Sequence, residues 1–150
     1  MTVRRSTIKH SGVLTELAKA SKKYWNYPEK YLAIWDDDLT VSAAYIEANH
    51  VFHLESDSGE IVGFYSFFNE AEMMRLEHLF ILPKFIGQKL GTMLMEDFLE
   101  KAEKSGCQKI ILDAEPNAEA FYKKFGFQTV ELKSSAIKDR TLPVMIKKIN

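Results

Sequence analysis

The sequence predicts a single α/β domain over residues 1–150, with three layers: helices cover both faces of a mixed, mostly antiparallel sheet of about six to seven strands. Before position 50 the apolar residues recur at helical spacing, and after it they follow strand-like patterns. From position 83 onward, helical and strand patterns alternate along the chain. With 150 residues, 46% of them hydrophobic, the chain is long enough to bury a real core.

The N-terminal third is predicted to be mostly helical. Val3–Ile8 is a short strand candidate, and the apolar spacing after it predicts a helix to about Tyr24. A second helix is expected to begin near Pro28, because proline is tolerated in the first helical turn. Thr40 is predicted to be the N-cap of a third, short helix.

The remaining chain predicts a hairpin and then strands separated by two helices. Gly63 lies inside the second hairpin strand, where it indicates a bulge or a close backbone approach. One helix is expected to end at Ser105-Gly106, and the other to have Asn117 as its N-cap. The expected strands are 50–56, 60–68, 73–82, 109–113, about 127–132 and 142–149.

Composition excludes several classes of protein. A net charge of −1 gives no basic excess for a nucleic acid or a membrane surface. The single cysteine, Cys107, cannot form an internal disulfide, and the four histidines show no metal-ligand spacing, so we expect no metal site. No stretch is apolar enough to span a bilayer, and the start of the chain lacks the apolar core of a signal peptide. We therefore expect a cytoplasmic protein with no membrane partner.

The stretch Glu77–Leu94 combines an apolar strand, a proline, a glycine-bearing loop and the start of a helix. Such a junction presents backbone N–H groups and the positive end of a helix dipole, which together favour an anion such as a pyrophosphate. The alternative is that Gly87 and Gly91 serve only a tight turn and helix packing. The phosphate hypothesis assumes that the loop can form without a positive φ at Lys89. The backbone N–H groups that would face the phosphate belong to Gln88, Lys89, Leu90, Gly91 and Thr92.

Two sequence motifs resemble a known family. The run LFILPKFIGQKLGTML is similar to the acyl-coenzyme A-binding segment of the GNAT superfamily of N-acetyltransferases, and PNAEAFYKKFGF resembles the next segment of that superfamily. The motifs YWNYP, EHLF and RTLPVMIKKI also resemble one bacterial subgroup of uncharacterised GNAT-like proteins. The chain departs from the family pattern at Ile86, where arginine or glutamine is usual, and at Lys89, where a glycine is usual.

The resemblance implies a GNAT-like fold and acetyl-CoA as the cofactor. Asn117 would hydrogen-bond the pantetheine arm, although capping its own helix is the alternative. The backbone N–H of Phe80 or Ile81 would polarise the thioester carbonyl. The implied cofactor-binding residues are Leu79, Phe80, Ile81, Gly87, Gln88, Lys89, Leu90, Gly91, Thr92, Asn117, Phe121 and Lys124.

The resemblance also assigns catalytic roles. Tyr122 matches the tyrosine that acts as general acid toward the leaving thiolate, and the alternative is a tyrosine packed under the sheet with its hydroxyl in water. An ammonium must lose a proton before it attacks, so a base is required. We favour Glu77, with His78 second. Strand alternation places the two on opposite faces, and a purely structural role for either one is the alternative.

The acceptor site is expected to come from the early helices and the last hairpin, with Trp25, Tyr27, Tyr31, Ser135 and Arg140 as candidates. The alternatives are an aromatic stripe in the core and an internally paired arginine. We expect an N-acetyltransferase acting on a primary amine of a small molecule. A protein or peptide acceptor, and an acyl-CoA-binding module with little catalysis, are the other two interpretations. A homodimer is left open.

Overall fold

The computed structural model describes residues 1–149 of the protein. Its internal contacts group the chain into two compact units. Unit 1 comprises Met1–Phe67 and His78–Leu99, and unit 2 comprises Phe68–Glu77 and the chain from Glu100 onward. The expectation of one domain stays a prediction, and each unit is described by itself below.

A mixed, mostly antiparallel sheet of seven strands confirms the predicted fold class. The strand order is β1-β2-β3-β4-β5-β7-β6. The strands are β1 (Thr2–Arg5), β2 (His50–Glu55), β3 (Ile61–Glu70), β4 (Met73–Ile81), β5 (Lys109–Asp113), β6 (Gln128–Ser134) and β7 (Thr141–Lys148). All six sequence-predicted strands after position 50 are therefore present, with small shifts at their ends.

The helices also follow the predicted order. They are η1 (Ile8–His10), α1 (Ser11–Lys23), α2 (Glu29–Ile34), α3 (Asp36–Leu39), α4 (Ala43–Ala48), η2 (Pro83–Phe85), α5 (Leu90–Ser105), η3 (Pro116–Ala118) and α6 (Glu119–Lys124). The predicted second helix is two short helices, α2 and α3, which meet at Trp35.

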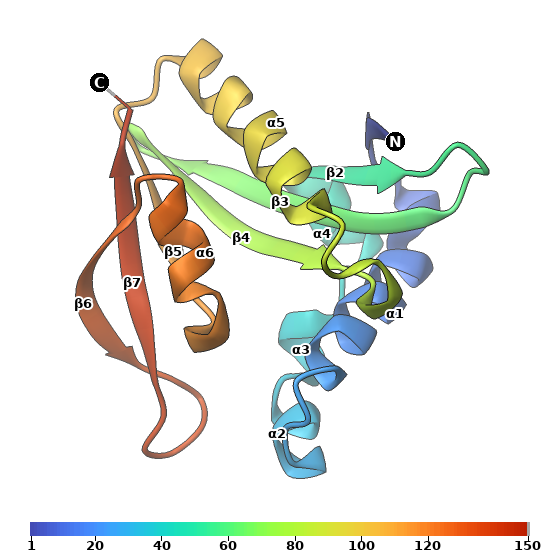
Figure 1. Cartoon of the computed structure of the whole chain (residues 1–150), viewed down its shortest axis with the longest axis horizontal. Coiled ribbons are helices and arrows are strands. Elements are labelled where there is room, and N and C mark those ends of the chain that lie inside the picture. The colour runs from blue at the N-terminus through green and yellow to red at the C-terminus, as the bar shows by residue number, and fades with distance from the viewer. Residues whose placement is uncertain (150) are drawn as a thin grey trace. The chain divides into compact units, whose positions relative to one another are not determined.

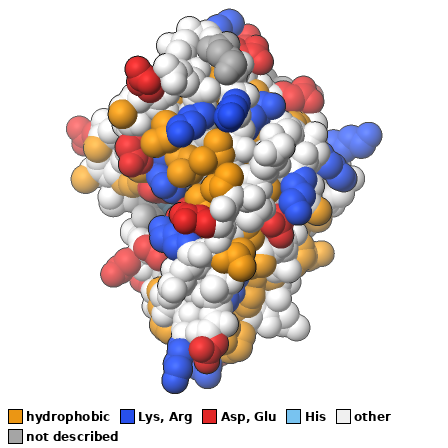
Figure 2. Space-filling view, turned by 90° about the vertical axis from the view of Figure 1, so that its left-hand side faces the viewer, with side chains coloured by type: hydrophobic (Ala, Val, Ile, Leu, Met, Phe, Trp, Pro, Cys, Tyr) orange, Lys and Arg blue, Asp and Glu red, His pale blue; other side chains and the backbone are white. Residues whose placement is uncertain are grey.

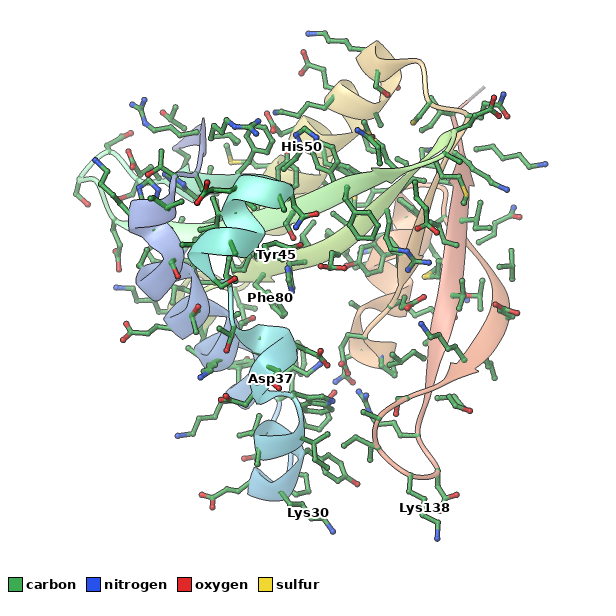
Figure 3. All side chains as sticks on the ribbon, turned by 180° about the vertical axis from the view of Figure 1, so that it is seen from behind. Lys30, Asp37, Tyr45, His50, Phe80 and Lys138 are labelled. Atoms are coloured by element: carbon green, nitrogen blue, oxygen red, sulfur yellow. The ribbon has the colours of Figure 1, made fainter. Side chains whose placement is uncertain are left out.

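In unit 1, α5 lies on one face of the strands, while α1 and α4 lie on the other (Figures 1 and 3). Burial explains the position of α5: Leu94, Met95 and Phe98 are buried, whereas Glu96 is exposed. The apolar residues lie three and four positions apart, so they occupy one side of the helix. Burial of this side fixes α5, and with it the loop that precedes the helix.

The prediction that Thr40 caps the third helix is wrong. The helix begins at Ala43, and the hydroxyl of Ser42 accepts the hydrogen bond from the backbone N–H of Tyr45 at 3.0 Å. The Thr40 hydroxyl instead donates to the carbonyl of Asp36, the first residue of α3. Serine and threonine are both good N-caps, so propensity alone could not choose between positions 40 and 42.

Gly63 has the close backbone approach that the sequence indicates. A Cβ atom at this position would lie 2.9 Å from the carbonyl oxygen of Phe80 and 2.6 Å from the Cδ1 atom of Ile81. The pairing of β2 with β3 also shifts register between Leu54, which pairs with Gly63, and Glu55. Glycine therefore allows β3 to pack against the end of β4.

In unit 2, β5 runs parallel to β4 and antiparallel to β7, and β6 pairs with β7 at the edge of the sheet. Figure 2 shows the face on the β6 and β7 side, where apolar side chains lie among charged ones. Val130 and Leu132 of β6 are among the exposed large apolar residues. An edge strand with exposed apolar residues is a surface on which a second chain can pair, so this strand is where the open question of a homodimer can be examined.

Candidate active site

His78, on β4 in unit 1, is held by hydrogen bonds at both ring nitrogens. Its Nδ1 atom lies 2.8 Å from the hydroxyl oxygen of Ser66, and its Nε2 atom lies 3.1 Å from the carbonyl oxygen of Asp38. A carbonyl oxygen only accepts, so Nε2 carries the proton and Nδ1 of the neutral ring accepts from Ser66. The Ser66 hydroxyl lies 2.8 Å from the hydroxyl of Tyr45. The orientation and tautomer of His78 are thus fixed by the fold.

Aromatic rings surround His78. Its ring centroid lies 5.5 Å from that of Tyr45 and 5.9 Å from those of Phe64 and Phe80. Tyr45 and Phe80, both labelled in Figure 3, each place a ring against that of His78. Sequence reasoning found His78 and Phe80 but missed Ser66 and Tyr45. The signal was present in the run FYSFF, where a serine inside an apolar strand will be buried and must find a partner.

Glu77 differs from His78 in its surroundings. It lies in the part of β4 that belongs to unit 2, and its side chain is exposed. The preceding Leu76 is buried, so the burial along β4 agrees with the alternation that puts Glu77 and His78 on opposite faces. An exposed carboxylate at this point can contact an amine, whereas His78 is reached through its hydrogen-bonded neighbours.

The pairing between β4 and β5 covers only part of both strands. The parallel ladder runs from Met73 and Lys109 to Arg75 and Ile111, although β4 continues to Ile81. Strand β5 keeps its pairing with β7 as far as Asp113. The segment of β4 that includes Leu79, Phe80 and Ile81 therefore lies beyond the β4–β5 ladder, and its side chains are half-buried.

The loop before α5 has the geometry of an anion site. Gly87 adopts a φ of +91°, and helix α5 begins at Leu90. The first intrahelical acceptor is the carbonyl of Lys89, which accepts from the backbone N–H of Met93. The N–H groups of Leu90, Gly91 and Thr92 belong to the first turn and have no acceptor within the helix. They carry the positive end of the helix dipole and favour a phosphate.

Lys89 adopts the positive φ that phosphate binding by this loop was expected to avoid. Its φ is +62°, in the left-handed region, at the position where the family pattern has a glycine. A residue with a Cβ atom pays about 1–2 kcal/mol for this conformation. The chain makes the turn nonetheless, so the backbone geometry is kept while the side chain has changed. The exposed Lys89 side chain also adds a positive charge beside the helix start.

Asn117, in unit 2, is not the N-cap of the following helix. It is the middle residue of η3, and the N-cap of α6 is Ala118, which has no side chain able to cap. The amide of Asn117 instead donates to the Glu115 carboxylate at 3.4 Å. The Pro116–Ala118 turn moved the N-cap by one residue, from Asn117 to Ala118, and so the expected capping role is wrong.

Tyr122 is buried on α6, with 9% of its surface exposed. Its ring contacts those of Phe121 and Phe127, at centroid distances of 5.3 and 5.9 Å. Burial raises the pKa of the Tyr122 phenol, and the negative charge of Glu115 raises this pKa further. Both effects disfavour the phenolate, so the hydroxyl keeps its proton at neutral pH and is able to donate it.

The other two cofactor candidates on α6 differ in exposure. Phe121 is half-buried and packs against Phe125 at a centroid distance of 5.1 Å. Lys124 is exposed in the last turn of the helix, where a positive charge interacts favourably with the helix dipole. Phe121 can therefore contribute an apolar surface, while Lys124 can contribute a charge.

The aromatic acceptor candidates in unit 1 fall into two groups. Tyr27 and Tyr31 pack around Trp35, with ring centroids 4.9 and 5.7 Å from it, and the Lys22 ammonium lies 4.2 Å from the Trp35 centroid. This cluster already holds a cation from its own chain. Trp25 is 46% exposed, and its ring forms a T-shaped pair with that of Tyr24 at a centroid distance of 5.2 Å. The structure therefore does not bring Trp25 into the group with Tyr27 and Tyr31.

The acceptor candidates in unit 2 are held by internal bonds. The Arg140 guanidinium lies 2.7 Å from the Glu115 carboxylate, the same carboxylate that accepts from Asn117. Both side chains of this ion pair are mostly buried, at 16% and 20% exposure. Ser135 bonds within its own loop to the backbone of Ile137. Sequence reasoning missed Glu115. Its carboxylate pairs with Arg140 and accepts from Asn117, and its charge raises the pKa of Tyr122.

Residues 21–142 match the family model described as "Acetyltransferase (GNAT) domain". This match covers most of the chain, and the chain therefore belongs to the GNAT acetyltransferase family. Members of this family use acetyl-CoA as the acetyl donor.

Two relatives and two solved structures illustrate the similarity. The chain is 32% identical over 81 residues to the glucosamine 6-phosphate N-acetyltransferase of Trypanosoma brucei brucei, covering 49% of this chain and 55% of the relative. It is 34% identical over 59 residues to an uncharacterized N-acetyltransferase of Schizosaccharomyces pombe, covering 37% and 36%. The matches thus span only about one third to one half of the length of these relatives.

The solved structures share the fold. The PaiA N-acetyltransferase of Thermoplasma acidophilum, in complex with coenzyme A, has a TM-score of 0.80 at 21% identity, covering 98% of both chains. The ribosomal-protein-S18-alanine N-acetyltransferase of Escherichia coli has a TM-score of 0.74 at 18% identity, covering 99% of this chain and 93% of that one. At these identities the likeness concerns the fold alone.

Two further observations concern residues 1–149. Within this range, the histidines, cysteine and carboxylates form no group of three or more that could hold a metal ion. In the same part of the chain, no helix combines the length and the apolar character needed to cross a membrane.

Proposed function

We propose that the protein is an N-acetyltransferase that moves an acetyl group from acetyl-CoA to a primary amine of a small molecule, by direct attack in a ternary complex. The observation that carries this proposal is Tyr122, a largely buried phenol on α6 whose ring packs against Phe121 and Phe127 and which is protonated at neutral pH. When bound, acetyl-CoA supplies a thioester, which is cleaved to a thiolate as the amide forms. A held phenolic proton is what such a leaving group needs.

The residues of the α5 loop fit the pyrophosphate of this cofactor. Two left-handed residues, Gly87 and Lys89, turn the backbone so that the first turn of α5 begins directly after them. The N–H groups of that turn and the Lys89 ammonium offer donors and positive charge to phosphate oxygens. In unit 2, the Asn117 amide donates to the Glu115 carboxylate and does not cap α6, and we propose that it also bonds the pantetheine arm.

Tyr122 is proposed as the general acid. Its hydroxyl oxygen would hold the proton until the thiolate leaves, and the carboxylate of Glu115 would disfavour ionisation of the phenol before that moment. Packing of the ring against Phe121 and Phe127 fixes the position of the hydroxyl oxygen. A rigidly placed donor is more effective than a mobile one because its orientation costs no further entropy.

Glu77 is proposed as the residue that directly contacts the amine, because its carboxylate is exposed. His78 cannot take a proton at Nε2, which already carries one, and its Nδ1 atom faces Ser66. A direct role for His78 is therefore less well supported than a role through its neighbours. Either route removes a proton from the ammonium, which is a condition for attack.

The small-molecule acceptor is supported by the relative named for glucosamine 6-phosphate, a small amine. The ribosomal-protein acetyltransferase of similar fold keeps a protein or peptide acceptor as the alternative. Arg140 is less suited to bind an acceptor carboxylate, because Glu115 already occupies its guanidinium.

Turnover across a panel of amines tests the function. Release of free thiol from acetyl-CoA would be followed with amino sugars, polyamines, arylalkylamines, amino acids and short peptides, and cofactor binding would be measured by calorimetry. We expect release with at least one small amine and acetylated product by mass spectrometry. Release only with peptides would favour the alternative acceptor. The matched control is Tyr24→Phe, which changes an exposed tyrosine in unit 1.

One observation favours a second candidate function, an acyl-CoA-binding module with little catalysis. Lys89 stands in a left-handed position that the family pattern gives to glycine, and Ile86 stands where a polar residue is usual. Tight acetyl-CoA binding without thiol release on any amine, by a protein with an intact melting transition, would support the module and reject the enzyme.

A further inference from the structure

Three hydroxyl and imidazole groups of unit 1 form an unbroken chain of hydrogen bonds. The Tyr45 hydroxyl of α4 lies 2.8 Å from the Ser66 hydroxyl of β3, which lies 2.8 Å from Nδ1 of His78 on β4. Nε2 of His78 lies 3.1 Å from the carbonyl of Asp38 on α3. The helices α3 and α4 and the strands β3 and β4 thus each contribute one polar group to this chain, which aromatic rings surround.

The direction of the chain follows from its last acceptor. The Asp38 carbonyl can only accept, so Nε2 donates to it, and Nδ1 of the neutral ring must accept from Ser66. The Ser66 hydroxyl then accepts from Tyr45. All three donors therefore point the same way, from Tyr45 to His78. This alignment is the condition for moving a proton along the chain without rotating a heavy atom.

We propose that Tyr45, Ser66 and His78 form a relay that takes the proton from the acceptor ammonium. The proposal rests on the N-acetyltransferase function proposed above. The Tyr45 oxygen accepts the proton from the ammonium while its own proton passes to Ser66, and the Ser66 proton passes to Nδ1 of His78. The amine is left neutral with a free electron pair, and the imidazole carries the charge.

Every group remains hydrogen-bonded after the transfer. Nδ1–H of His78 donates to Ser66, Ser66 donates to Tyr45, and Nε2–H still donates to Asp38. Ser66 is completely buried, so the intermediate step is shielded from water. Tyr45 is half-buried and is the member that meets the substrate, while Ser66 and His78 act through it as positioning residues.

Charged groups on the surrounding elements must be considered in any pH experiment. Helix α3 carries Asp36, Asp37 and Asp38, and Asp36 is paired with Lys19 at 2.8 Å. Helix α4 carries Glu47, and Glu77 precedes His78 on β4. The titration of these carboxylates must be separated from that of the imidazole.

The test compares two classes of acceptor in Tyr45→Phe and Ser66→Ala. One acceptor is an alkylamine that is protonated at the assay pH, and the other is a hydrazide that is already neutral. A relay is needed only for the first. We expect kcat/KM for the alkylamine to fall by about 10²-fold in both variants, the low end for a lost acid–base group. The rate with the hydrazide should stay close to that of the wild type.

The pH profile supplies a second readout. In the wild type, kcat/KM should fall toward acid pH as the imidazole becomes protonated and can no longer receive the proton. Tyr45→Phe should lose this dependence for the alkylamine, since His78 is disconnected, and the hydrazide, which needs no relay, should show it in neither protein. Tyr24→Phe, the control, should match the wild type with both acceptors.

The outcomes separate the relay from the function on which it rests. If the wild type releases no thiol with either acceptor, the proposed function fails and the relay with it. If the wild type is active and both acceptors lose rate equally in the variants, the network is only structural and the relay is rejected. Should Ser66→Ala fail to fold, Tyr45→Phe decides alone, because it removes one hydroxyl from a half-buried ring.

Discussion

The two motifs expected to bind the cofactor are built in different ways. The α5 loop in unit 1 depends on backbone N–H groups, and it keeps its turn although Lys89 replaces the usual glycine. The Pro116–Lys124 segment in unit 2 depends on particular side chains, Asn117 and Tyr122, whose properties are set by burial and by Glu115. A site made of backbone tolerates a substitution at a modest cost in stability. A site made of a single phenol does not.

The largest expected effect is therefore in unit 2. Tyr122→Phe removes only the hydroxyl, and we expect kcat to fall by about 10²-fold because the thiolate loses its proton donor. This corresponds to about 2.7 kcal/mol in the barrier. Acetyl-CoA affinity should be unchanged, since the ring and its packing remain. Single-turnover kinetics with the best amine would measure the chemical step.

An unchanged chemical step in Tyr122→Phe would remove the general-acid role. Equal losses in Tyr24→Phe would show that the assay responds to something other than this hydroxyl. The contrast between the two motifs would then lose its main support, because neither motif would depend on one particular side chain.

The stability of the protein at alkaline pH is a second way to test the burial of Tyr122 in unit 2. The folded state raises the pKa of Tyr122, chiefly by burial, so the folded chain keeps this proton at a pH where the unfolded chain releases it. Stability from this group is intact below about pH 10 and is lost above it. We expect the free energy of unfolding to fall more steeply with pH in the wild type than in Tyr122→Phe, by up to about 1.4 kcal/mol per pH unit.

Urea unfolding at several values between pH 8 and 11 would measure this difference. Tyr65, in unit 1, is also buried with a raised pKa, and it contributes equally to both proteins. It therefore cancels in the comparison. Parallel curves for the wild type and Tyr122→Phe would mean that the phenol is not kept from ionising by the fold.

A smaller effect is expected in the α5 loop. Lys89→Gly relieves the left-handed strain but adds entropy to the unfolded chain, so we expect the free energy of unfolding to rise by about 0.5 to 1 kcal/mol. Lys89→Ala is the matched variant, because it loses the same charge and keeps the strain. Thermal and urea unfolding would compare the two.

Cofactor binding in the same pair of variants isolates the charge of Lys89. If the ammonium contacts the pyrophosphate, both should bind acetyl-CoA more weakly than the wild type, and the difference should shrink at high salt. A Lys89→Gly protein that is less stable than Lys89→Ala would contradict the strain argument.

The smallest effect on stability is expected for Asn117→Ala. Because Asn117 does not cap α6, the free energy of unfolding should change by less than about 0.5 kcal/mol. Loss of one hydrogen bond to the cofactor should weaken acetyl-CoA binding by roughly 2- to 10-fold. Calorimetry and thermal unfolding of the same sample test both statements. Lower stability with normal affinity would return Asn117 to a purely structural role.

Much of the fold could be predicted because it rests on local patterns. Apolar periodicity predicts the strands 73–82 and 109–113 and the α5 helix. A glycine inside a strand pattern predicts the close backbone approach at position 63. Errors arose where two local choices had similar energies, as at Thr40 and Ser42, or where a proline turn delayed a helix, as at Asn117. Neither choice has a strong local signal.

The sequence by itself determined the family, the strand and helix order, and the residue types available for the chemistry. Tertiary structure decided their states: the left-handed φ of Lys89, the burial that raises the pKa of Tyr122, and the ion pair between Arg140 and Glu115. It also brought Tyr45, Ser66 and His78 into one line. The physical reason is that backbone strain, desolvation and long-range hydrogen bonds depend on neighbours distant in sequence, which no local pattern records.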